Sequence, residues 1–464
     1  MGKNNKREVN NSSELIYQLD GRPPLSKALP LGIQHVLAMF TGNLAPIFVL
    51  TGILGTSASD RIIMIQSAML VSGLITFLQL YPFKIGKFQI GSKLPIVMGT
   101  SFAFVPTMQA ISEKLHGEGI SPEIAMGIIL GGTLLGGFVE DIMGIFIKPL
   151  KKFFPPLVVG SVLVTIGIKL LGTGANYFVG SPKTANDFDP RNLVLGFTVL
   201  LTILLINRFA KGLWKASSIL VGLVAGYTLA LFMGMVNFDT IANASWASVP
   251  TPFHFKLAFR MDVIMAFFAV YVVSGLETIG NTSGITIAAF NRDATGEETS
   301  GAILADAVGS QVAAIFNTLP NTAFGQNAGI VAMTGVVNRF CIATGAAVLV
   351  LAGFFPKIGA IFSAMPNSVL GGAVVTVFAM ILLNGIKMIA SAGFNDINNL
   401  IVGVTFGLGY GVGNLPAEIK AKFPVVMQYI FQEPVAAVCI VSVIACLIFK
   451  PKKIEEASVS ALES

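Results

Sequence analysis

Apolar runs of roughly 20 residues recur along the chain from Leu31 to Phe449, and each is long enough to cross a hydrocarbon core of about 30 Å. Only 12% of the 464 residues are charged, whereas a soluble domain carries about 25%. The mean hydropathy of +0.77 also indicates a bilayer as the surroundings. We count about fourteen runs and predict an all-α polytopic membrane protein, because a helix satisfies its own backbone hydrogen bonds in lipid.

The basic residues indicate how the chain is oriented in the membrane. A net charge of +6 could suggest a nucleic-acid partner, but the Lys and Arg residues lie in short loops between the apolar runs. With both tails inside, most of the 30 Lys and Arg residues fall on the cytoplasmic side, as the positive-inside rule requires. We therefore predict a multi-pass protein of the cytoplasmic membrane with both termini in the cytoplasm. The main basic groups are Lys84, Lys87 and Lys93; Lys148, Lys151 and Lys152; and Lys450, Lys452 and Lys453.

The apolar runs divide into two sets of about seven on either side of a polar loop, and an odd number requires the two halves to be inverted. We predict a cytoplasmic tail at 1–29, a first repeat at 30–236, an extracellular loop at 237–260, a second repeat at 261–449 and a cytoplasmic tail at 450–464. Small-residue spacings such as Gly132 with Gly136 and Gly222 with Gly226 predict close helix packing, within the chain or at a dimer face.

The third segment of each half carries the same interruption. Leu94-Pro95 opens one and Leu319-Pro320 opens the other. Proline lacks an amide hydrogen and glycine is flexible, so both segments should be partly extended before they become half-helices. Paired broken segments in inverted halves indicate a substrate site near the bilayer midplane, although kinked helices that only pack are the alternative. The residues that follow the two openings include Gly99, Ser101 and Phe102 in the first half, and Gly325, Gln326 and Asn327 in the second.

Several classes of enzyme are excluded by missing motifs. The chain has no phosphate-binding loop of the Gly-x-x-x-x-Gly-Lys-Ser/Thr type and no His-Glu-x-x-His. Its histidines and cysteines are too dispersed for a metal cluster or a disulfide framework. We therefore expect neither an ATPase nor a metal enzyme, and no cofactor. The residues concerned are His35, His116 and His254, and Cys341, Cys439 and Cys446.

Two carboxylates stand within apolar runs. A charge at the bilayer centre costs about 2.5–3.5 kcal/mol or more, so Glu277 and Asp306 each need a reason to be there. Asn281 and Ser310 follow them by one helical turn on the same face. Binding a proton would remove the charge during a conformational change, which is the chemistry of a symporter. The alternative is structural, with Glu277 capping a broken segment and Asp306 bonded within the bundle.

Other polar residues in the runs have simpler interpretations. Glu140 and Asp141 lie towards the end of their run, so we interpret them as interfacial. His35 within the first run is either a neutral hydrogen-bonding strut or a titrating group, and the neutral form avoids the cost of burying a charge.

The amides Gln326 and Asn327 at the second break are the most informative polar pair. A primary amide offers a donor and an acceptor, so it can pair with the N–H and C=O edge of a planar base. At the matching first break, Phe102 could cover a flat ring, although an aromatic residue in a membrane span is often only packing.

The stretch Gln-Asn-Ala-Gly-Ile-Val-Ala-Met-Thr-Gly at 326–335 resembles the Gln-Asn-x-Gly-x-x-x-x-Thr signature of the nucleobase–ascorbate transporter family. Further short stretches look like the bacterial xanthine and urate permease branch of that family. Together they cover nearly the whole chain in order. They are Asp20-Gly21-Arg22-Pro23-Pro24, Gln34-His35, Leu276-Glu277-Thr278-Ile279-Gly280, Leu304-Ala305-Asp306 and Gly371-Gly372-Ala373.

The resemblance implies a fourteen-segment inverted-repeat fold with a core and a gate domain, often dimeric, which moves a nucleobase together with protons. It assigns purine hydrogen bonds to Glu277 and Gln326 and stacking to Phe102. Further roles by motif position are a backbone contact at Gly325, orientation of the network by Asn327, coupling at Asp306 and His35, and extra room for urate at Ser101.

The expected function is therefore proton-coupled import of xanthine, uric acid or both. The uracil branch has Glu where Gln326 stands, which argues for an oxidised purine and leaves a pyrimidine permease as the alternative. Asn281 departs from the Asp of xanthine-permease relatives, which puts a coupling role for that position in doubt. An anion channel and a membrane sensor are alternatives from other classes, which Glu277 and the lack of a soluble domain disfavour.

Overall fold

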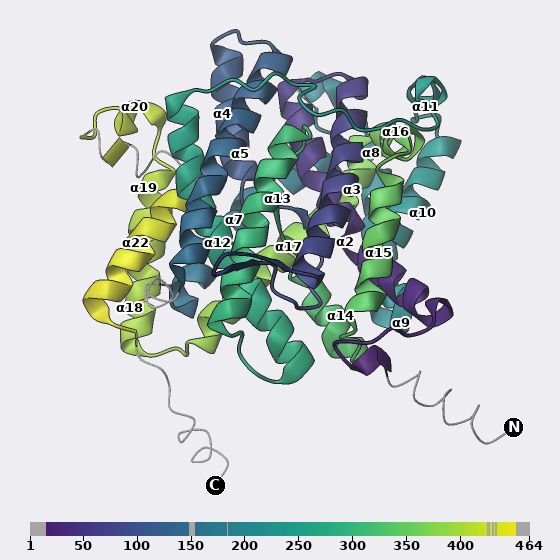
Figure 1. The fold of residues 1–464 in the computed structure, drawn as a ribbon. Helices are drawn as coiled ribbons and strands as arrows, with labels where there is room; N and C mark the ends of the chain where they lie inside the picture. Colours follow the sequence, from purple (N-terminus) through teal and green to yellow (C-terminus); the bar gives the residue numbers. More distant parts are fainter. Residues whose placement is uncertain are drawn as a thin grey trace, which may run out of the picture. The chain divides into compact units, whose positions relative to one another are not determined.

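We describe the fold from a computed structural model, in which residues 15–147, 154–182, 184–424, 427–428, 431 and 434–451 are described (Figure 1). The described chain is predominantly helical, as predicted, with two short two-stranded sheets. Residues 1–14 of the predicted N-terminal tail and 452–464 of the predicted C-terminal tail lie outside the described residues, as do the basic residues Lys148, Lys151 and Lys152.

The chain forms two compact units, one made of 1–145 with 173–376 and the other of 146–172 with 377–464. Each unit takes residues from both predicted repeats, 30–236 and 261–449. The division into repeats stays a prediction, as does the division into core and gate domains. The predicted extracellular loop at 237–260 contains one short helix, α11 (Phe238–Asn243).

The first unit contains most of the helices, and two further helices cross into the second unit. Its longer helices are α2 (Leu25–Leu54), α3 (Ala58–Leu80), α4 (Val105–Gly117), α5 (Pro122–Ile145), α8 (Arg191–Phe209), α10 (Ser218–Phe232), α12 (Met261–Phe290), α13 (Gly296–Ile315), α14 (Gln326–Thr334), α15 (Arg339–Ala352) and α16 (Pro356–Ser363). The crossing helices are α7 (Pro156–Phe178) and α17 (Asn367–Ser391).

The second unit is smaller. It contains α18 (Asp396–Val404), a π-helix (Thr405–Tyr410), α19 (Gly411–Gly413), α20 (Ala417–Lys420) and α22 (Pro434–Phe449). Within this unit, Gly160 of α7 packs against the backbone of α17, where an added Cβ would lie 2.8 Å from the carbonyl oxygen of Gly385. A glycine is therefore needed for this close approach.

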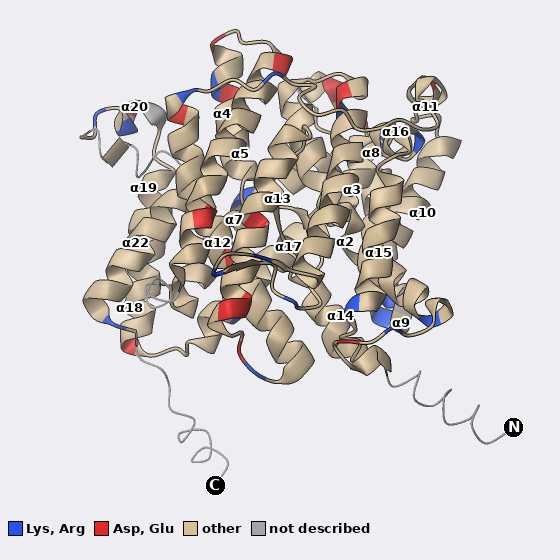
Figure 2. Cartoon of the chain, viewed as in Figure 1, with Lys and Arg blue, Asp and Glu red and all other residues tan. Residues whose placement is uncertain are grey.

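Seven of the described helices are long and apolar enough to cross a membrane, and α15 with α16 would make an eighth span with an 82° bend. The remaining predicted segments coincide with α13, with shorter helices or with the interrupted segments, so the count of fourteen stays a prediction. Figure 2 shows charged residues mainly in loops and at helix ends. On α8, Leu201, Leu204 and Leu205 are about half exposed, as expected for side chains that face lipid.

The glycine spacings mark contacts within the chain, as one of the two interpretations predicted. Gly132 and Gly136 of α5 pack against Phe267 and Tyr271 of α12, where an added Cβ at Gly136 would lie 2.4 Å from the tyrosine ring. The same holds at Gly226 of α10, which packs against α8. Gly132 and Gly136 therefore allow α5 and α12 to approach closely, and Gly226 does the same for α10 and α8.

The two interrupted segments contain strands that pair with each other. β3 (Met98–Thr100) and β4 (Asn321–Ala323) form an antiparallel sheet in which Gly99 lies opposite Thr322. The half-helices α4 and α14 follow these strands, so the prediction of an extended stretch before each half-helix is confirmed. A second hairpin, β1 (Phe83–Ile85) with β2 (Phe88–Ile90), lies in a loop for which the sequence analysis made no prediction.

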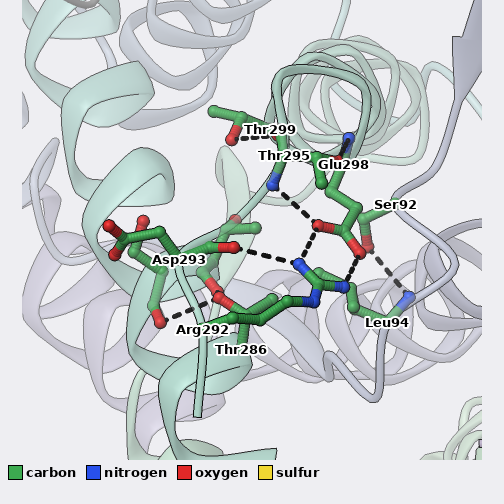
Figure 3. Close-up of polar contacts among 10 residues, drawn as sticks. Ser92, Leu94, Thr286, Arg292, Asp293, Thr295, Glu298 and Thr299 are labelled. Carbon is green, nitrogen blue, oxygen red and sulfur yellow. Dashed lines mark hydrogen bonds and ion pairs between the residues drawn. The ribbon is translucent and has the colours of Figure 1, made fainter. Parts of the chain in front are cut away.

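The turn between α12 and α13 is fixed by a capping box (Figure 3). Thr295 Oγ1 accepts from the amide of Glu298 at 3.2 Å, and Glu298 Oε2 accepts from the amide of Thr295 at 2.8 Å. The Arg292 guanidinium donates to both Glu298 oxygens, at 2.8 and 2.6 Å. These bonds satisfy free amides at the start of α13, the helix that carries Asp306.

We predict that Thr295→Ala destabilises the protein, because the first turn of α13 loses its side-chain acceptor, a change that costs about 0.5–2 kcal/mol. The unfolding temperature of the detergent-solubilised protein should fall. Thr295→Ser keeps the hydroxyl and serves as the control, which should unfold close to the wild type. Equal unfolding temperatures for the alanine variant and the wild type would contradict the prediction.

Candidate functional site

The paired strands lie among α2, α3, α12 and α13 within the first unit. All six residues of β3 and β4 are buried. Their sheet edges would leave backbone groups unpaired in lipid, so neighbouring polar side chains must supply partners. The candidate site is built around these partners.

Asn43 of α2 anchors β3. Its Oδ1 accepts from the Thr100 amide at 2.8 Å, from the Thr100 hydroxyl at 3.0 Å and from the Ser72 hydroxyl at 2.9 Å. Thr76 of α3 adds a fourth contact, because its hydroxyl accepts from the Met98 amide at 2.9 Å. Asn43 was not among the predicted site residues, although an amide in the middle of an apolar run is a usable signal.

Ser310 and Asn281 hold β4 from the other side. The Ser310 hydroxyl accepts from the Asn321 amide at 3.0 Å and donates to the Asn321 carbonyl at 3.1 Å. Asn281 Nδ2 donates to the Ala323 carbonyl at 2.8 Å. Asn281 also lies so close to Gly325 that an added Cβ there would be 2.4 Å from Asn281 Oδ1. Any larger residue at position 325 would therefore have to displace the Asn281 side chain.

Asp306 is fully buried and binds hydroxyls from two elements. Its Oδ2 accepts from Thr278 of α12 and, at 3.1 Å, from Thr322 of β4, whereas its Oδ1 has no hydrogen-bond partner. The structure thus places Asp306 where α12, α13 and β4 meet. Both a structural and a coupling role are compatible with this position.

Glu277 is half-buried, and its Oε2 atom is buried without a hydrogen-bond partner. It stands on α12 directly before Thr278 and one helical turn before Asn281, and both of these residues contact the broken segment. A carboxylate oxygen that is enclosed but unpaired can accept a bond from a bound molecule. The substrate contact that the resemblance assigns to Glu277 stays a prediction.

His35 and Asn327 are brought together from opposite ends of the chain. Asn327 Nδ2 lies 2.8 Å from His35 Nδ1, and both side chains are buried. The pairing fits a neutral imidazole that accepts at Nδ1 and carries its proton on Nε2. His35 Nε2 and Asn327 Oδ1 have no partners in the structure. His35 thus contacts Asn327 as a hydrogen-bonding strut would, and the choice between strut and titrating group stays open.

Phe102 and Phe324 both pack over Gly42 of α2. An added Cβ at Gly42 would lie 2.7 Å from Phe324 Cε1 and 3.6 Å from Phe102 Cε2. Ser101, beside Phe102, is buried, and its amide donates to the Pro320 carbonyl at 2.8 Å. The two broken segments therefore meet at Gly42, with an aromatic ring from each. Phe324, which directly precedes Gly325, was not among the predicted site residues.

Gln326 begins α14 and is only half-buried, unlike its neighbour Asn327. Its amide is thus more accessible than the residues that anchor the strands. Among the residues that the structure describes, no group of His, Cys, Asp or Glu side chains could hold a metal ion. The arrangement suits a small planar molecule that both donates and accepts hydrogen bonds.

A model of a permease family matches residues 26–418. The chain belongs to the nucleobase–ascorbate transporter family. It is 33% identical to the xanthine permease of Bacillus subtilis over 441 residues, which cover 94% of this chain and 97% of the relative. It is 32% identical to xanthine permease XanQ of Escherichia coli over 432 residues, which cover 92% and 91%. A nucleobase–ascorbate transporter is a membrane permease and not an enzyme.

The fold is shared with a more distant transporter. The transmembrane domain of the cyanobacterial bicarbonate transporter BicA superposes with a TM-score of 0.57 at 14% sequence identity. The match covers 92% of this chain and 99% of the BicA chain. The nucleobase–ascorbate transporter described here therefore has the fold of a known multi-pass membrane transporter.

In this nucleobase–ascorbate transporter, the stretch beginning with Asp20 ties the N-terminal segment to α15. Arg339 pairs with Asp20, and its guanidinium lies over the Tyr81 ring at 5.1 Å from the centroid. The hydrogen bond from Arg339 holds the pKa of Asp20 below its usual range. Asn338 Nδ2 also donates to the Gly21 carbonyl at 3.4 Å. This stretch of the family resemblance thus has a structural function.

The interpretation of Glu140 as an interfacial residue is wrong. Glu140 is fully buried, and neither carboxylate oxygen has a hydrogen-bond partner. Its neighbour Asp141 is only half-buried and accepts from Gln311 Nε2 at 2.7 Å. The sequence shows that Glu140 is near the end of its apolar run. It does not show that the glycines of α5 allow other helices to pack closely around this residue.

We predict that Asn281→Asp makes transport depend more strongly on pH. The amide now donates to the Ala323 carbonyl, and an ionised carboxylate would place an acceptor against an acceptor. A protonated carboxyl group can still donate, so activity should be retained at low pH and lost as the pH rises. Initial uptake rates of the variant and the wild type over a pH series test this. A variant with the wild-type profile would argue against the hydrogen bond as the role of Asn281.

Proposed function

We propose that this permease imports xanthine, uric acid or both across the cytoplasmic membrane, driven by protons. The observation that carries the proposal is the half-buried Gln326 amide, which begins α14 directly after the glycine that packs against the Asn281 side chain. The names of the two relatives, both xanthine permeases, support a purine substrate.

The proposed substrate contacts come from two half-buried polar side chains, Gln326 and Glu277, and from the residues of the two broken segments. The Gln326 amide would pair with an N–H and C=O edge of the purine, and the open Glu277 oxygen would accept from a ring N–H. Phe102 would stack on the ring, with Ser101 beside it and the Gly325 backbone within reach of the substrate. Asn327, held by His35, would keep the start of α14 in position.

Proton coupling is proposed for the carboxylates. Glu277 and Asp306 each have a buried oxygen without a partner, and a proton on either would remove a charge that is costly in a membrane. His35 belongs to the surrounding network through Asn327. No cofactor is required beyond the coupling ion, which we propose to be H⁺.

We expect cells that lack their own nucleobase transporters to accumulate labelled xanthine or urate when they express the chain. A protonophore should abolish this accumulation, because the proton gradient would be its driving force. Failure of both purines to accumulate would overturn the proposal. Currents without proton dependence would instead favour the alternative of an anion channel.

We predict that Gln326→Glu weakens purine transport, because the substrate loses a donor and meets a charged acceptor. The loss of a buried hydrogen bond costs about 1–3 kcal/mol, so the apparent affinity for xanthine should fall roughly tenfold or more. Competition by unlabelled xanthine, urate and uracil measures the effect in both proteins. The alternative, a uracil permease, predicts stronger competition by uracil in the wild type and little change in the variant.

We also propose fourteen segments in a seven-plus-seven inverted repeat with both termini in the cytoplasm. The two paired broken segments, β3–α4 and β4–α14, support the repeat. Reporter fusions at both ends should give the cytoplasmic signal, and a reporter within 237–260 should give the external one. An external signal from either terminus would contradict this topology.

We also propose, from the family resemblance, that the protein forms a homodimer. The molecular mass of the purified protein in detergent would test this.

A further inference from the structure

A third buried carboxylate lies outside the residues proposed to bind the substrate. Glu140 of α5 is 0% exposed, and neither of its two oxygens has a hydrogen-bond partner. Asp306 and Asp141, in contrast, accept hydrogen bonds from Thr322 and Gln311. Structural carboxylates that are buried make such bonds, because an unpaired buried charge is costly. Packing alone gives no reason for an acid at this position.

The face of α5 that carries Glu140 is set by glycines. Gly137 and Gly144 share this face, three residues before and four residues after Glu140. An added Cβ at Gly137 would lie 3.5 Å from the Ala307 carbonyl oxygen, and one at Gly144 would lie 2.7 Å from Leu304 Cγ. Glu140 therefore faces the stretch of α13 that contains Asp306.

A second helix closes the site. An added Cβ at Gly275 of α12 would lie 3.8 Å from Glu140 Cγ, so the glutamate side chain packs over a glycine two residues before Glu277. The Ser274 hydroxyl is buried beside it and is the polar side chain close enough to act on the carboxyl group as a donor. No hydrogen bond of normal geometry joins the hydroxyl to the carboxyl oxygens.

The charged groups that act on Glu140 are all acidic. They are Asp306 on α13, Asp141 on its own helix and Glu277 on α12. On α12 the Tyr271 hydroxyl is occupied, because it donates to the Thr133 carbonyl at 2.9 Å. On α4 and α2, which also pack against α5, Lys114 is paired with Asp262, and His35 with Asn327. No basic group is available to neutralise Glu140 among the residues described.

The geometry points to Glu140 as a proton-binding site of the transport cycle, separate from the groups that contact the substrate. A proton is the cation that fits, because the described carboxylates are not grouped closely enough to hold a metal ion. The proton comes from water when Glu140 loads and returns to water when it unloads. When Glu140 is ionised, a small side-chain rotation lets Ser274 donate to it. This inference rests on the proposed proton-driven transport and adds a further proton carrier to it.

The test compares Glu140→Gln with Asp141→Asn, a neighbouring acid that already has a partner, in purified protein reconstituted into liposomes. Glu140→Gln should keep exchange of labelled xanthine within about twofold of the wild type, because the substrate contacts are untouched. It should lose most of the accumulation driven by an imposed pH gradient. Asp141→Asn and the conservative variant Glu140→Asp should retain that accumulation. Wild-type accumulation and an unchanged pH profile in Glu140→Gln would overturn the inference.

A second measurement does not require transport. Infrared difference spectra between acidic and alkaline pH should contain a carboxyl C=O band that disappears in Glu140→Gln and persists in Asp141→Asn. An identical band in Glu140→Gln and the wild type would overturn the inference. If xanthine is not transported at all, the proposed substrate fails, whereas the infrared result still decides whether Glu140 binds a proton.

Discussion

The pairing of two three-residue strands is the constraint on which the site depends. A backbone that leaves the helix inside a membrane needs a partner for every freed amide and carbonyl group. β3 and β4 supply part of this to each other, and Asn43, Thr76 and Ser310 supply more from three surrounding helices. The strands can therefore stay extended at membrane depth, and this leaves the residues after them, rather than the strands themselves, available to a substrate.

The carboxyl groups of Asp306, Glu277 and Glu140 differ in how far their hydrogen-bonding capacity is used. Asp306 has one oxygen occupied by hydroxyls and one open, Glu277 has an open buried oxygen in a partly accessible side chain, and Glu140 has none of its capacity used. Their surroundings thus separate them into distinct environments within one unit. Groups of the same chemical type in different environments can take different roles in one cycle.

The features of the site that depend only on neighbouring residues in the sequence could be predicted. Leu-Pro openings followed by glycine predicted both extended breaks, because proline removes a donor and no distant residue changes that. The contact between His35 and Asn327 could not be predicted from residue properties, since it joins positions 292 residues apart. The burial of Glu140 was missed for a related reason. It depends on which helices pack on Gly137 and Gly275, whereas the sequence shows only that the residue is near the end of a run.

The antiparallel register has an electrostatic consequence for the site. Because Thr100 lies opposite Asn321, the ends of the two strands point in opposite directions, and α4 and α14 leave from opposite ends of the sheet. Both half-helices therefore start beside the strand pair, and each N-terminus carries a partial positive charge of about half an elementary charge. Glu277 and Asp306 lie on the helices that contact β4, so these partial charges offset part of the negative charge that the two carboxylates would carry when ionised.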